Sequence, residues 1–475
     1  MPRRTNRSPA TLRQQVYERL RSAIERGTFA PGARLPPSRE HAAALGVARN
    51  TVLWALERLR AEGYVVARVG DGSYVAPDLS LPRPLARRAA AEPALSHRGR
   101  LITETAHRWR PPVSPPVAFR IGYPAVDEFP FAVWERIARQ IPERRRRATA
   151  WYLDPAGHAP LRAAIAQWLL VSRGIRCEAQ QVIVTSGSQQ AIDLIGRLLL
   201  DVGDEVMVED PGYPGIRASL LGQGAVVRPV AVDDEGLCIA AGAARWPAAR
   251  IAVVTPTHQY PLGVRMSLAR RHALLDWAQS QRAWIVEDDY DGEFQYGAHR
   301  IPALCSLRHD GRVLYVGTFS KTLHPGLRLG FIVLPAALAE PFANAKALSD
   351  RHSPGEAQEV LARFIADGHL LRHLRRMREL YAERQAVTIA ALHGASGGAL
   401  SLATSEHGMH LFHEIAPGAR DTTLYVRALE AGVFVAPLSA YTIESKRRGW
   451  LFGYAGYDAP ALRAGARVVG GLLRG

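Results

Sequence analysis

The chain has 475 residues and 47% apolar content, which is ample for two or more packed globular domains. No apolar run reaches the roughly 18 residues of a membrane span, no signal peptide is expected at its start, and three scattered cysteines lack metal-ligand or disulfide spacing. The net charge of +16 is concentrated in residues 1–118, whose 20 arginines against 9 acidic residues suit a polyanion, with an arginine-rich coding bias as the alternative.

The N-terminal region has the pattern of three short helices. Apolar residues recur about once per helical turn from Leu12 to Ile24 and predict the first helix. Ser38 is a favourable N-cap for a second short helix, which Gly46 ends. A tight turn then leads into a third helix that begins near Arg49. Two short helices joined by a tight turn are typical of a helix-turn-helix.

A glycine-rich hairpin follows these helices. Two β-rich runs, residues 64–68 and 73–76, flank Gly70-Asp71-Gly72, which predicts two paired strands with a tight tip. Three helices and a hairpin together predict a winged helix-turn-helix domain over residues 1–76.

Residues 29–40 and 45–52 resemble the DNA-binding domain of GntR-type regulators, and the resemblance extends over roughly residues 10–76. It implies that a double-stranded DNA operator is a partner. The residues expected to face DNA are Arg39, Arg49, Asn50 and Thr51, with Gly72 letting the wing approach a minor groove. Arginines and helix N-termini suit phosphates, and a recognition helix offers its first turn to base edges. Leu53 occupies a position where some members of the family have arginine. The alternative interpretation of this region is a structural helical domain with ordinary surface arginines.

Residues 77–118 differ in composition from both neighbouring regions. Prolines alternate there with arginines and alanines, without sustained periodicity. This pattern predicts a semi-extended linker between two domains.

From Phe119 onward, apolar β-rich runs alternate with helical patterns such as residues 191–200 and 269–279. The candidate buried strands are residues 182–184, 206–208, 251–254, 284–286, 313–316 and 331–334. Continuous apolar strands indicate a mainly parallel sheet that is covered on both faces, as in an α/β domain.

Polar residues follow several of these strands, where α/β folds place ligands. Residues 185–190 join a strand to a helix, so their backbone N–H groups can hold a phosphate. Residues 209–214 offer an aromatic face, and residues 287–290 offer carboxylates and a phenol. Lys321 follows another strand, and Arg328 lies seven residues further on. A Schiff-base amine and groups for an anion suit an aldehyde cofactor that carries a phosphate.

These segments in this order, with residues 151–157 and Leu161-Arg162, resemble the fold-type I pyridoxal-phosphate (PLP) enzymes of the class I aminotransferase group. The resemblance implies an aminotransferase-like domain over residues 119–475 with a smaller α+β C-terminal part. It implies that Lys321 forms the internal aldimine and that Asp288 keeps the pyridine nitrogen protonated, with Asp289 as the alternative. The other implied cofactor contacts are Tyr290 at the ring oxygen, Tyr213 on the ring, Ser188, Gln189, Thr318 and Arg328 at the phosphate, and Tyr152 from the partner subunit of a homodimer.

A metal site is the alternative for the three acidic residues at 287–289. Histidines or further carboxylates at ligand spacing are not evident in the sequence nearby, so no metal is expected.

The chain departs from the aminotransferase pattern at two positions. Tyr260 occupies the place of an asparagine that helps to hold the ring oxygen, and His258 or Gln259 are candidate substitutes. Leu451 occupies the place of the arginine that grips the substrate carboxylate, with Arg447 and Arg448 as candidate substitutes. Without a bidentate guanidinium, amino-acid binding loses a strong oriented contact, so productive transamination is not expected.

Winged helix, linker and aminotransferase-like domain together resemble the MocR branch of the GntR regulators over nearly the whole chain. The resemblance implies a cytoplasmic homodimer, with no membrane partner, that binds an operator and senses PLP or an amine through a Schiff base. The absent arginine favours PLP itself as the signal, as in the vitamin B6-sensing, PdxR-like members. A working aminotransferase with an auxiliary DNA-binding module is the main alternative, because Lys321 and Asp288 are retained. A DNA-binding protein with an empty relic domain is the third.

Overall fold

The computed structural model describes residues 11–68, 70–79, 94–109, 118–297, 302–308, 311–416 and 418–474. The chain divides into two compact units, Met1–Ala94 and Leu95–Gly475. Among the described residues, none of the helices combines the length and the apolar character that a membrane span needs.

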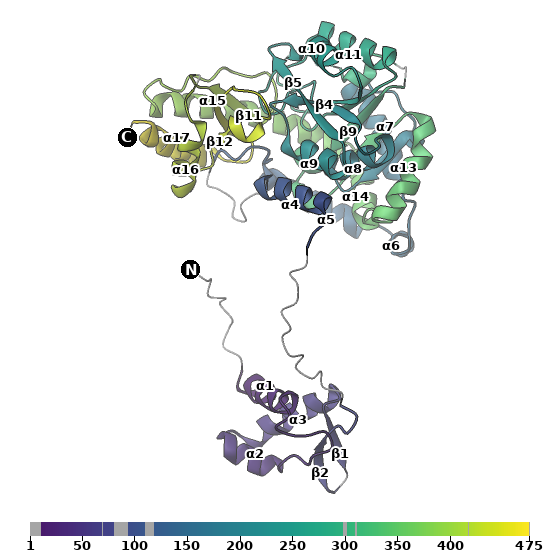
Figure 1. Cartoon of the computed structure of the whole chain (residues 1–475), viewed down its shortest axis with the longest axis vertical. Coiled ribbons are helices and arrows are strands. Elements are labelled where there is room, and N and C mark those ends of the chain that lie inside the picture. The colour runs from purple at the N-terminus through teal and green to yellow at the C-terminus, as the bar shows by residue number, and fades with distance from the viewer. Residues whose placement is uncertain are drawn as a thin grey trace. The chain divides into compact units, whose positions relative to one another are not determined.

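The first unit is a winged helix-turn-helix, as the sequence predicts (Figure 1). Its elements are α1 Leu12–Glu25, α2 Ser38–Leu45, α3 Arg49–Ala61, and the antiparallel hairpin of β1 Val65–Arg68 and β2 Gly72–Val75. Apolar side chains of α1 and α3, such as Leu20 and Leu59, form its core. Gly46 ends α2 in the left-handed conformation (φ 63°), which glycine adopts without a Cβ clash.

Ser38 does not cap α2, contrary to the prediction. Pro37 holds the N-cap position without a side-chain hydrogen bond, and Ser38 is the first residue inside the helix. The Ser38 hydroxyl instead accepts a hydrogen bond from Arg49 Nε at 3.1 Å. This bond joins the starts of the two helices of the helix-turn-helix.

The predicted linker is partly helical, which corrects its description as a semi-extended segment. Helix α4, His97–Trp109, belongs to the second unit, and Ser96 Oγ caps it by accepting from Gly99 N at 3.0 Å. Arg98 of α4 donates to the carbonyl of Gly222 and to Gln223 Oε1, at 3.1 Å for the latter. Docking on another helix therefore stabilises a segment whose own composition favours no helix. Residues 80–93 and 110–117 of the predicted linker lie outside the described residues.

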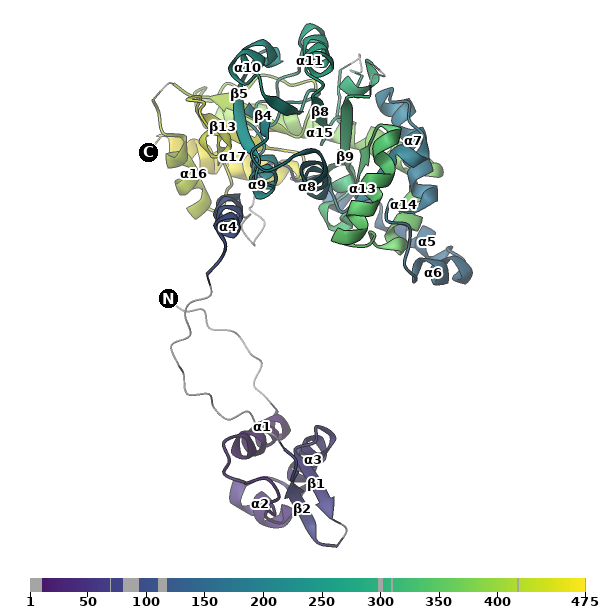
Figure 2. The same cartoon turned by 45° about the vertical axis from the view of Figure 1, so that its right-hand side comes forward.

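The second unit is built on an eight-stranded sheet, which Figure 2 shows from a second side. Its spatial order is β3 Val182–Thr185, β10 Gly330–Val333, β9 Val313–Thr318, β8 Trp284–Asp288, β7 Ala249–Val254, β4 Glu205–Asp210, β5 Val226–Asp233 and β6 Gly236–Leu237. Neighbouring strands are parallel, with two exceptions. Strand β10 is antiparallel to both β3 and β9, and β6 is antiparallel to β5. The six predicted strands are confirmed.

Helices cover both faces of this sheet, which explains the continuous apolar strands. In β3, Val182 and Val184 pack with residues of α7 Ala159–Arg173 and α14 Gly355–Ala366, whereas Ile183 packs with α8 Ser188–Leu199 and α13 Ala336–Ser349. The remaining helices of this part are α5 Phe131–Arg139, α6 Glu143–Thr149, α9 Pro214–Gly222, α10 Ile239–Arg245, α11 Leu268–Ser280 and α12 Phe319–Thr322.

The C-terminal part has the predicted α+β character. A three-stranded antiparallel sheet has β13 Gly449–Gly453 between β11 His410–Glu414 and β12 Ala436–Pro437. The long helix α15 His369–Ala395 packs along α17 Ala459–Arg474, and α16 Asp421–Glu430 lies beside the latter.

Candidate functional site

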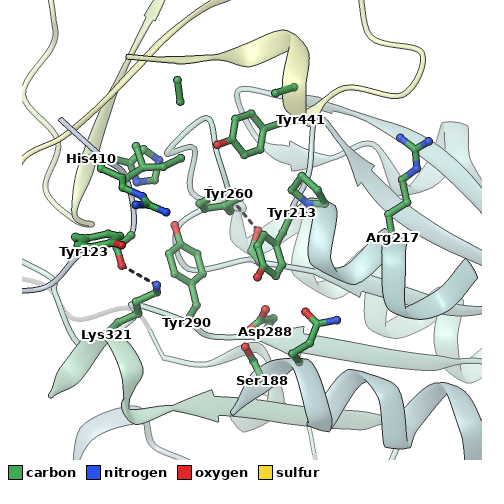
Figure 3. A pocket seen from close by; sticks show the side chains of 18 of the residues that line it. Tyr123, Ser188, Tyr213, Arg217, Tyr260, Asp288, Tyr290, Lys321, His410 and Tyr441 are labelled. Carbon is green, nitrogen blue, oxygen red and sulfur yellow. Dashed lines mark hydrogen bonds between the residues drawn. The ribbon is translucent and has the colours of Figure 1, made fainter. Parts of the chain in front are cut away.

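A cavity of about 1150 Å³ lies where the carboxyl ends of β3, β8 and β9 meet (Figure 3). Eight of the nine predicted cofactor residues line it: Ser188, Gln189, Tyr213, Asp288, Tyr290, Thr318, Lys321 and Arg328. Because these side chains come from separate segments, the fold brings together what the sequence only orders along the chain.

Lys321 is held in the cavity by a backbone carbonyl. Its Nζ donates to Gly122 O at 2.7 Å. Gly122 has φ 75°, and a Cβ on it would lie 3.1 Å from Nζ, so glycine allows the amine this position. Burial lowers the pKa of Lys321, and Arg120 lowers it further, while the carboxylates of Asp291 and Asp288 oppose the shift. A lowered pKa favours the neutral, nucleophilic amine.

Asp288 offers an acceptor that the protein itself leaves open. It ends β8, and its buried Oδ1 makes no hydrogen bond within the described residues. Burial raises its pKa to about 7, the carboxylates of Asp289 and Glu209 add to the rise, and the Lys321 amine opposes it. A buried carboxylate with an open oxygen fits a protonated ring nitrogen, whose charge would favour its ionised form. The donor set therefore fits PLP.

Asp289 points elsewhere. Its Oδ2 accepts from Arg173 Nε at 2.7 Å and from Tyr315 OH at 2.6 Å. Glu287 accepts from the backbone N–H groups of Leu304 and Cys305, both at 2.8 Å. The three adjacent acidic residues thus diverge, and no cluster of three potential metal ligands occurs in the described parts of the chain. Of the two aspartates, Asp288 alone lines the cavity.

The phosphate end of the predicted site forms around the start of α8. Ser188 is the first residue of this helix, where free N–H groups and the helix dipole attract an anion. Gly187, whose φ of 127° favours glycine, lies beside the Arg328 guanidinium, and a Cβ there would lie in ordinary contact with Nη2 at 3.6 Å. Thr318 caps α12 by accepting from Ser320 N. Gln189 donates to Gly215 O at 2.9 Å, and its buried Oε1 makes no hydrogen bond to a described residue.

Aromatic side chains form the upper wall in Figure 3. Tyr260, in the place of the aminotransferase asparagine, has its ring 5.5 Å from the rings of Tyr213 and Tyr290, edge-on to both, and 5.6 Å from that of Tyr441. Burial raises the pKa of Tyr441 to about 12. Burial also raises the pKa of Tyr213, Tyr260 and Tyr290, so these phenols stay protonated.

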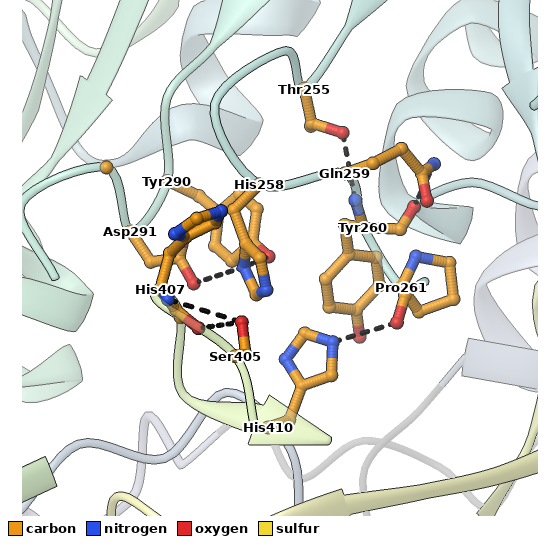
Figure 4. A network of polar contacts seen from close by, with 12 residues as sticks. Thr255, His258, Gln259, Tyr260, Pro261, Tyr290, Asp291, Ser405, His407 and His410 are labelled. Atoms are coloured by element: carbon orange, nitrogen blue, oxygen red, sulfur yellow. Dashed lines mark hydrogen bonds and ion pairs between the residues drawn. The ribbon is translucent and has the colours of Figure 1, made fainter. Parts of the chain in front are cut away.

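His258 lies behind the cavity wall and contacts two residues that line it, Tyr290 and His410 (Figure 4). Its Nδ1 lies 2.8 Å from Tyr290 OH and 2.9 Å from Asp291 Oδ2. Gln259 donates to Glu209 Oε2 at 3.2 Å and to nearby carbonyls. Neither residue is in the cavity wall, so neither replaces the asparagine directly, contrary to that expectation.

The two arginines proposed as substitutes for the carboxylate grip do not reach the cavity. Arg447 pairs with Glu414 at 2.8 Å, and Arg448 donates to the carbonyls of Ser445 and Arg447. Leu451 is fully buried in β13 and does not line the cavity. Arg120, which belongs to no sequence motif named above, does line it.

Tyr152 is the predicted cofactor residue that lies outside the cavity. It is 81% exposed, with its ring 6.2 Å from His352 and 5.4 Å from the guanidinium of Arg351. Its role at the phosphate of a partner subunit stays a prediction.

In the first unit, the predicted DNA contacts divide into two groups. Arg39, Arg49, Asn50 and Gly72 are exposed, at the helix-turn-helix and on the hairpin. Thr51 is only 8% exposed, because it packs on the inner side of α3, so little of it is available to DNA, unlike its neighbours.

The comparisons with known proteins match both units. Residues 12–75 match the family of bacterial regulatory proteins, gntR family, and residues 123–455 match aminotransferase class I and II. A probable rhizopine catabolism regulatory protein, MocR, of Rhizobium meliloti is 39% identical over 96% of this chain and 92% of its own length. The pyridoxine biosynthesis transcriptional regulator PdxR of Corynebacterium glutamicum is 30% identical over 80% of this chain and 78% of its own.

A solved structure agrees in fold. The α-aminoadipate aminotransferase LysN of Thermus thermophilus, complexed with N-(5'-phosphopyridoxyl)-L-leucine, has a TM-score of 0.71 and 28% identity, covering 78% of this chain and 96% of its own. Matches over both units and nearly the whole length show the family. The chain belongs to the MocR-type regulators of the GntR family, DNA-binding transcription regulators with a PLP-dependent aminotransferase-like domain.

Proposed function

We propose that this chain is a homodimeric sensor in which cofactor and amine occupancy of the cavity changes the affinity for an operator, and that it does not work as a turnover aminotransferase. The observation that carries this proposal is the position of α4. Leu101 and Glu104 of this helix line the cavity, and α4 begins at the end of the segment that leads from the DNA-binding unit.

The cavity residues have distinct tasks in this proposal. Bound PLP supplies an aldehyde that condenses with an amine and a ring that withdraws electrons. Lys321 presents a buried amine with a lowered pKa, and Asp288 holds the proton at the ring nitrogen. Ser188 and Arg328 hold the phosphate. Tyr290 donates its hydroxyl to the ring oxygen, with His258 fixing its position.

Helix α9 connects the cavity to α4. Tyr213 directly precedes α9, and Arg217 on its next turn also lines the cavity. At its other end, the carbonyl of Gly222 accepts from Arg98, and Ile102 of α4 lies against Gly222. A displacement of Tyr213 by a ligand therefore moves the surface on which α4 docks. Coupling of this kind requires different affinities for two arrangements.

Homodimer formation is supported by an exposed aromatic pair. Trp151 and Tyr152 are 76% and 81% exposed, which is unusual for large aromatic side chains. Their position in the segment that resembles the aminotransferase dimer contact supports a contribution to the partner's phosphate site.

The test is a DNA-binding titration of the full-length protein with duplexes selected from a random pool. We expect PLP, or PLP with an amine, to change the affinity by roughly 5- to 150-fold, the usual range of allosteric coupling. An affinity that is independent of every ligand would remove the proposal. Repeated turnover of an amino acid with a keto acid would instead support the working aminotransferase, which the eight cofactor residues in the cavity wall keep as the second candidate.

A further inference from the structure

We propose that Asp291 and His258 form a buried positioning pair that keeps the Tyr290 hydroxyl a hydrogen donor to the ring oxygen of the cofactor. The inference deepens the proposed function and rests on it, because the cofactor is the PLP assigned to this cavity. From behind the cavity wall, the pair performs the task of the aminotransferase asparagine, whose place Tyr260 occupies.

Two neighbouring strands bring the pair together. His258 lies in the connection that follows β7, and Asp291 lies three residues after the end of β8. These strands are parallel neighbours in the sheet, so the segments that follow them meet at one edge. Both side chains are 1% exposed. His258 Nδ1 lies 2.9 Å from Asp291 Oδ2 and 2.8 Å from the hydroxyl of Tyr290, which lines the cavity (Figure 4).

The partners of His258 fix which of its ring nitrogens carries the hydrogen. An ionised carboxylate only accepts hydrogen bonds, so Nδ1 must donate to Asp291. Nε2 is buried and has no hydrogen-bond partner among the described residues. A hydrogen on Nε2 would therefore be a buried donor without an acceptor, which is costly. Both nitrogens thus favour the tautomer with its hydrogen on Nδ1.

The backbone of Gly408 encloses the Nε2 side of the imidazole. Gly408 has φ 90°, and a Cβ on it would collide with Cε1 and Nε2 of His258, so this close approach requires glycine. The Gly408 N–H donates to Phe294 O at 2.9 Å, and its carbonyl accepts from Tyr454 OH at 2.8 Å and from Tyr296 OH. Because its polar groups are engaged elsewhere, Gly408 fixes the ring by packing and offers Nε2 no hydrogen bond.

This tautomer decides where the Tyr290 hydrogen can go. Since Nδ1 already carries a hydrogen, His258 cannot accept one from Tyr290. Burial raises the pKa of Tyr290 and the charge of Asp291 adds to the rise, so the phenol keeps its hydrogen. Asp291 is its acceptor within the protein. Tyr290 can turn this hydrogen to an ionised ring oxygen without leaving Asp291 unpaired, because His258 still donates to the carboxylate.

Tyr290 and Asp288 then contact two different polar atoms of one ring. Asp288 Oδ1 is a buried acceptor without a partner among the described residues and suits a protonated ring nitrogen. Tyr290 is a donor and suits an ionised ring oxygen. Hydrogen bonds to charged groups are about twice as strong as neutral ones. The cavity is therefore expected to select the form of the ring that carries both charges.

The test measures how strongly the full-length protein prefers PLP over its 3-deoxy analogue, which lacks only the ring oxygen. Equilibrium dialysis of the PLP-free protein gives the dissociation constant of each compound. Both compounds carry the aldehyde and the phosphate, so effects of a substitution on Lys321 or on the phosphate contacts largely cancel in the ratio. This ratio reports on the ring oxygen and needs no turnover.

We expect the wild type to prefer PLP and Tyr290→Phe to reduce this preference by roughly 10- to 100-fold, because it removes a hydrogen bond to a charged oxygen. His258→Leu should lose most of the same preference. His258→Asn should keep it, since its amide nitrogen lies near the position of Nδ1 and can donate there. His258→Gln places its amide nitrogen near the position of Nε2 and should lose it.

A double-mutant cycle shows whether His258 acts through Tyr290. In the Tyr290→Phe background, His258→Leu should cause no further loss of preference, because the hydrogen that His258 directs is gone. His413→Asn is the matched control and should keep the wild-type preference. His413 lies on β11 outside the cavity wall, with its ring stacked 6.0 Å from that of Trp450 and its Nδ1 3.2 Å from Ser401 O.

Wild-type preference in folded His258→Leu, equal preferences in His258→Asn and His258→Gln, or no preference in the wild type would overturn this inference and leave the proposed function intact. A loss that His258→Leu causes equally with and without the Tyr290 hydroxyl would overturn it as well. Absence of a Lys321-dependent cofactor band in the wild type would overturn the proposed function and the inference together. Thermal unfolding of each PLP-free variant separates a lost contact from a lost fold, and the two amide variants decide the matter where His258→Leu does not fold.

Discussion

The two units of this chain present their predicted functional side chains in opposite ways. In the first unit, Arg39, Arg49 and Asn50 are exposed and lie within one short stretch of sequence. In the second unit, residues as far apart as Gly122 and Arg328 converge in one cavity, where burial shifts the pKa values of Lys321 and Asp288. A surface that binds a polyanion needs only a local pattern, whereas a buried site needs the whole fold. The two functions should therefore be separable by mutation.

The largest expected effect is the complete loss of cofactor attachment, without loss of DNA binding, when Lys321 is replaced. Lys321→Ala removes the only amine proposed for cofactor attachment and should abolish the visible absorption band of bound PLP. DNA affinity measured without PLP should stay within about twofold of the wild type, because the first unit has its own core. A cofactor band that persists in Lys321→Ala would show that another amine holds PLP.

Asp289→Asn should produce the largest loss of stability. It removes the carboxylate that Arg173 Nε contacts at 2.7 Å, and both side chains of this pair are at most 2% exposed. Removal of one member of a buried ion pair typically costs about 3–5 kcal/mol. Urea unfolding of the PLP-free protein, followed by a probe in the second unit, measures this loss. A neutral effect would mean that Asp289 does not anchor Arg173.

The effect of Asp288→Asn on stability should differ from that of Asp289→Asn, because it should depend on pH. Burial raises the pKa of Asp288 from 3.8 to about 7, so the folded state favours its protonated form. The stability that Asp288 contributes is therefore complete below pH about 3.8 and is lost as the pH rises toward about 7. Without PLP, the free energy of unfolding of Asp288→Asn relative to that of the wild type should rise from about pH 5 to about pH 8. The affinity of the mutant for PLP should fall.

The measurement is a pair of urea titrations at the two pH values, with and without PLP. A difference between mutant and wild type that does not change with pH would contradict the raised pKa. Asp289→Asn serves as the control, since its loss should appear at both pH values.

Arg49→Ala should have the reverse effect of Lys321→Ala, because it changes the exposed surface predicted to bind DNA and not the cofactor cavity. Arg49 begins α3 and its Nε donates to Ser38, so it is oriented at the helix N-terminus that faces DNA in the proposal. Its removal should weaken operator binding by roughly 5- to 100-fold and leave the cofactor band unchanged. Thr51→Ala is the comparison, because its 8% exposure predicts a smaller effect on DNA binding. Equal DNA affinity of Arg49→Ala and wild type would refute the assignment of α3 as the recognition helix.

The parts of the molecule that were predictable from sequence are those with local or continuous signals. Helices of the first unit follow their apolar spacing, and the six buried strands follow continuous apolar runs. Strand β5 was missed because Arg228 and Pro229 interrupt its apolar run. Helix α4 was missed because glycine, threonine and isoleucine weaken its helical pattern, although Ser96 is a recognisable N-cap.

The candidate site shows the same division. The motif residues Lys321, Asp288 and Arg328 line the cavity, because Asp288 ends β8, Lys321 lies just after β9 and Arg328 lies just before β10. The sequence could not decide between Asp288 and Asp289, since the choice depends on Arg173, more than a hundred residues away. Arg120 had no motif of its own, and its place in the wall follows from backbone pairing with β13.

The smallest effect tests whether the two units communicate. Arg98→Ala removes the donor that holds α4 to the carbonyl of Gly222 and to Gln223, at the end of α9 that is remote from Tyr213. Both the ligand-free DNA affinity and PLP binding should stay near the wild-type values, because Arg98 lies outside both sites. The ratio of DNA affinities with and without ligand should shrink toward one, as α4 no longer follows α9. Arg100→Ala, on the same helix, is the matched control. Among the described residues, the Arg100 side chain makes no hydrogen bond to α9. If Arg98→Ala keeps the full ligand response, the signal does not pass through the docking of α4, and the exposed and buried sites are coupled by another part of the fold.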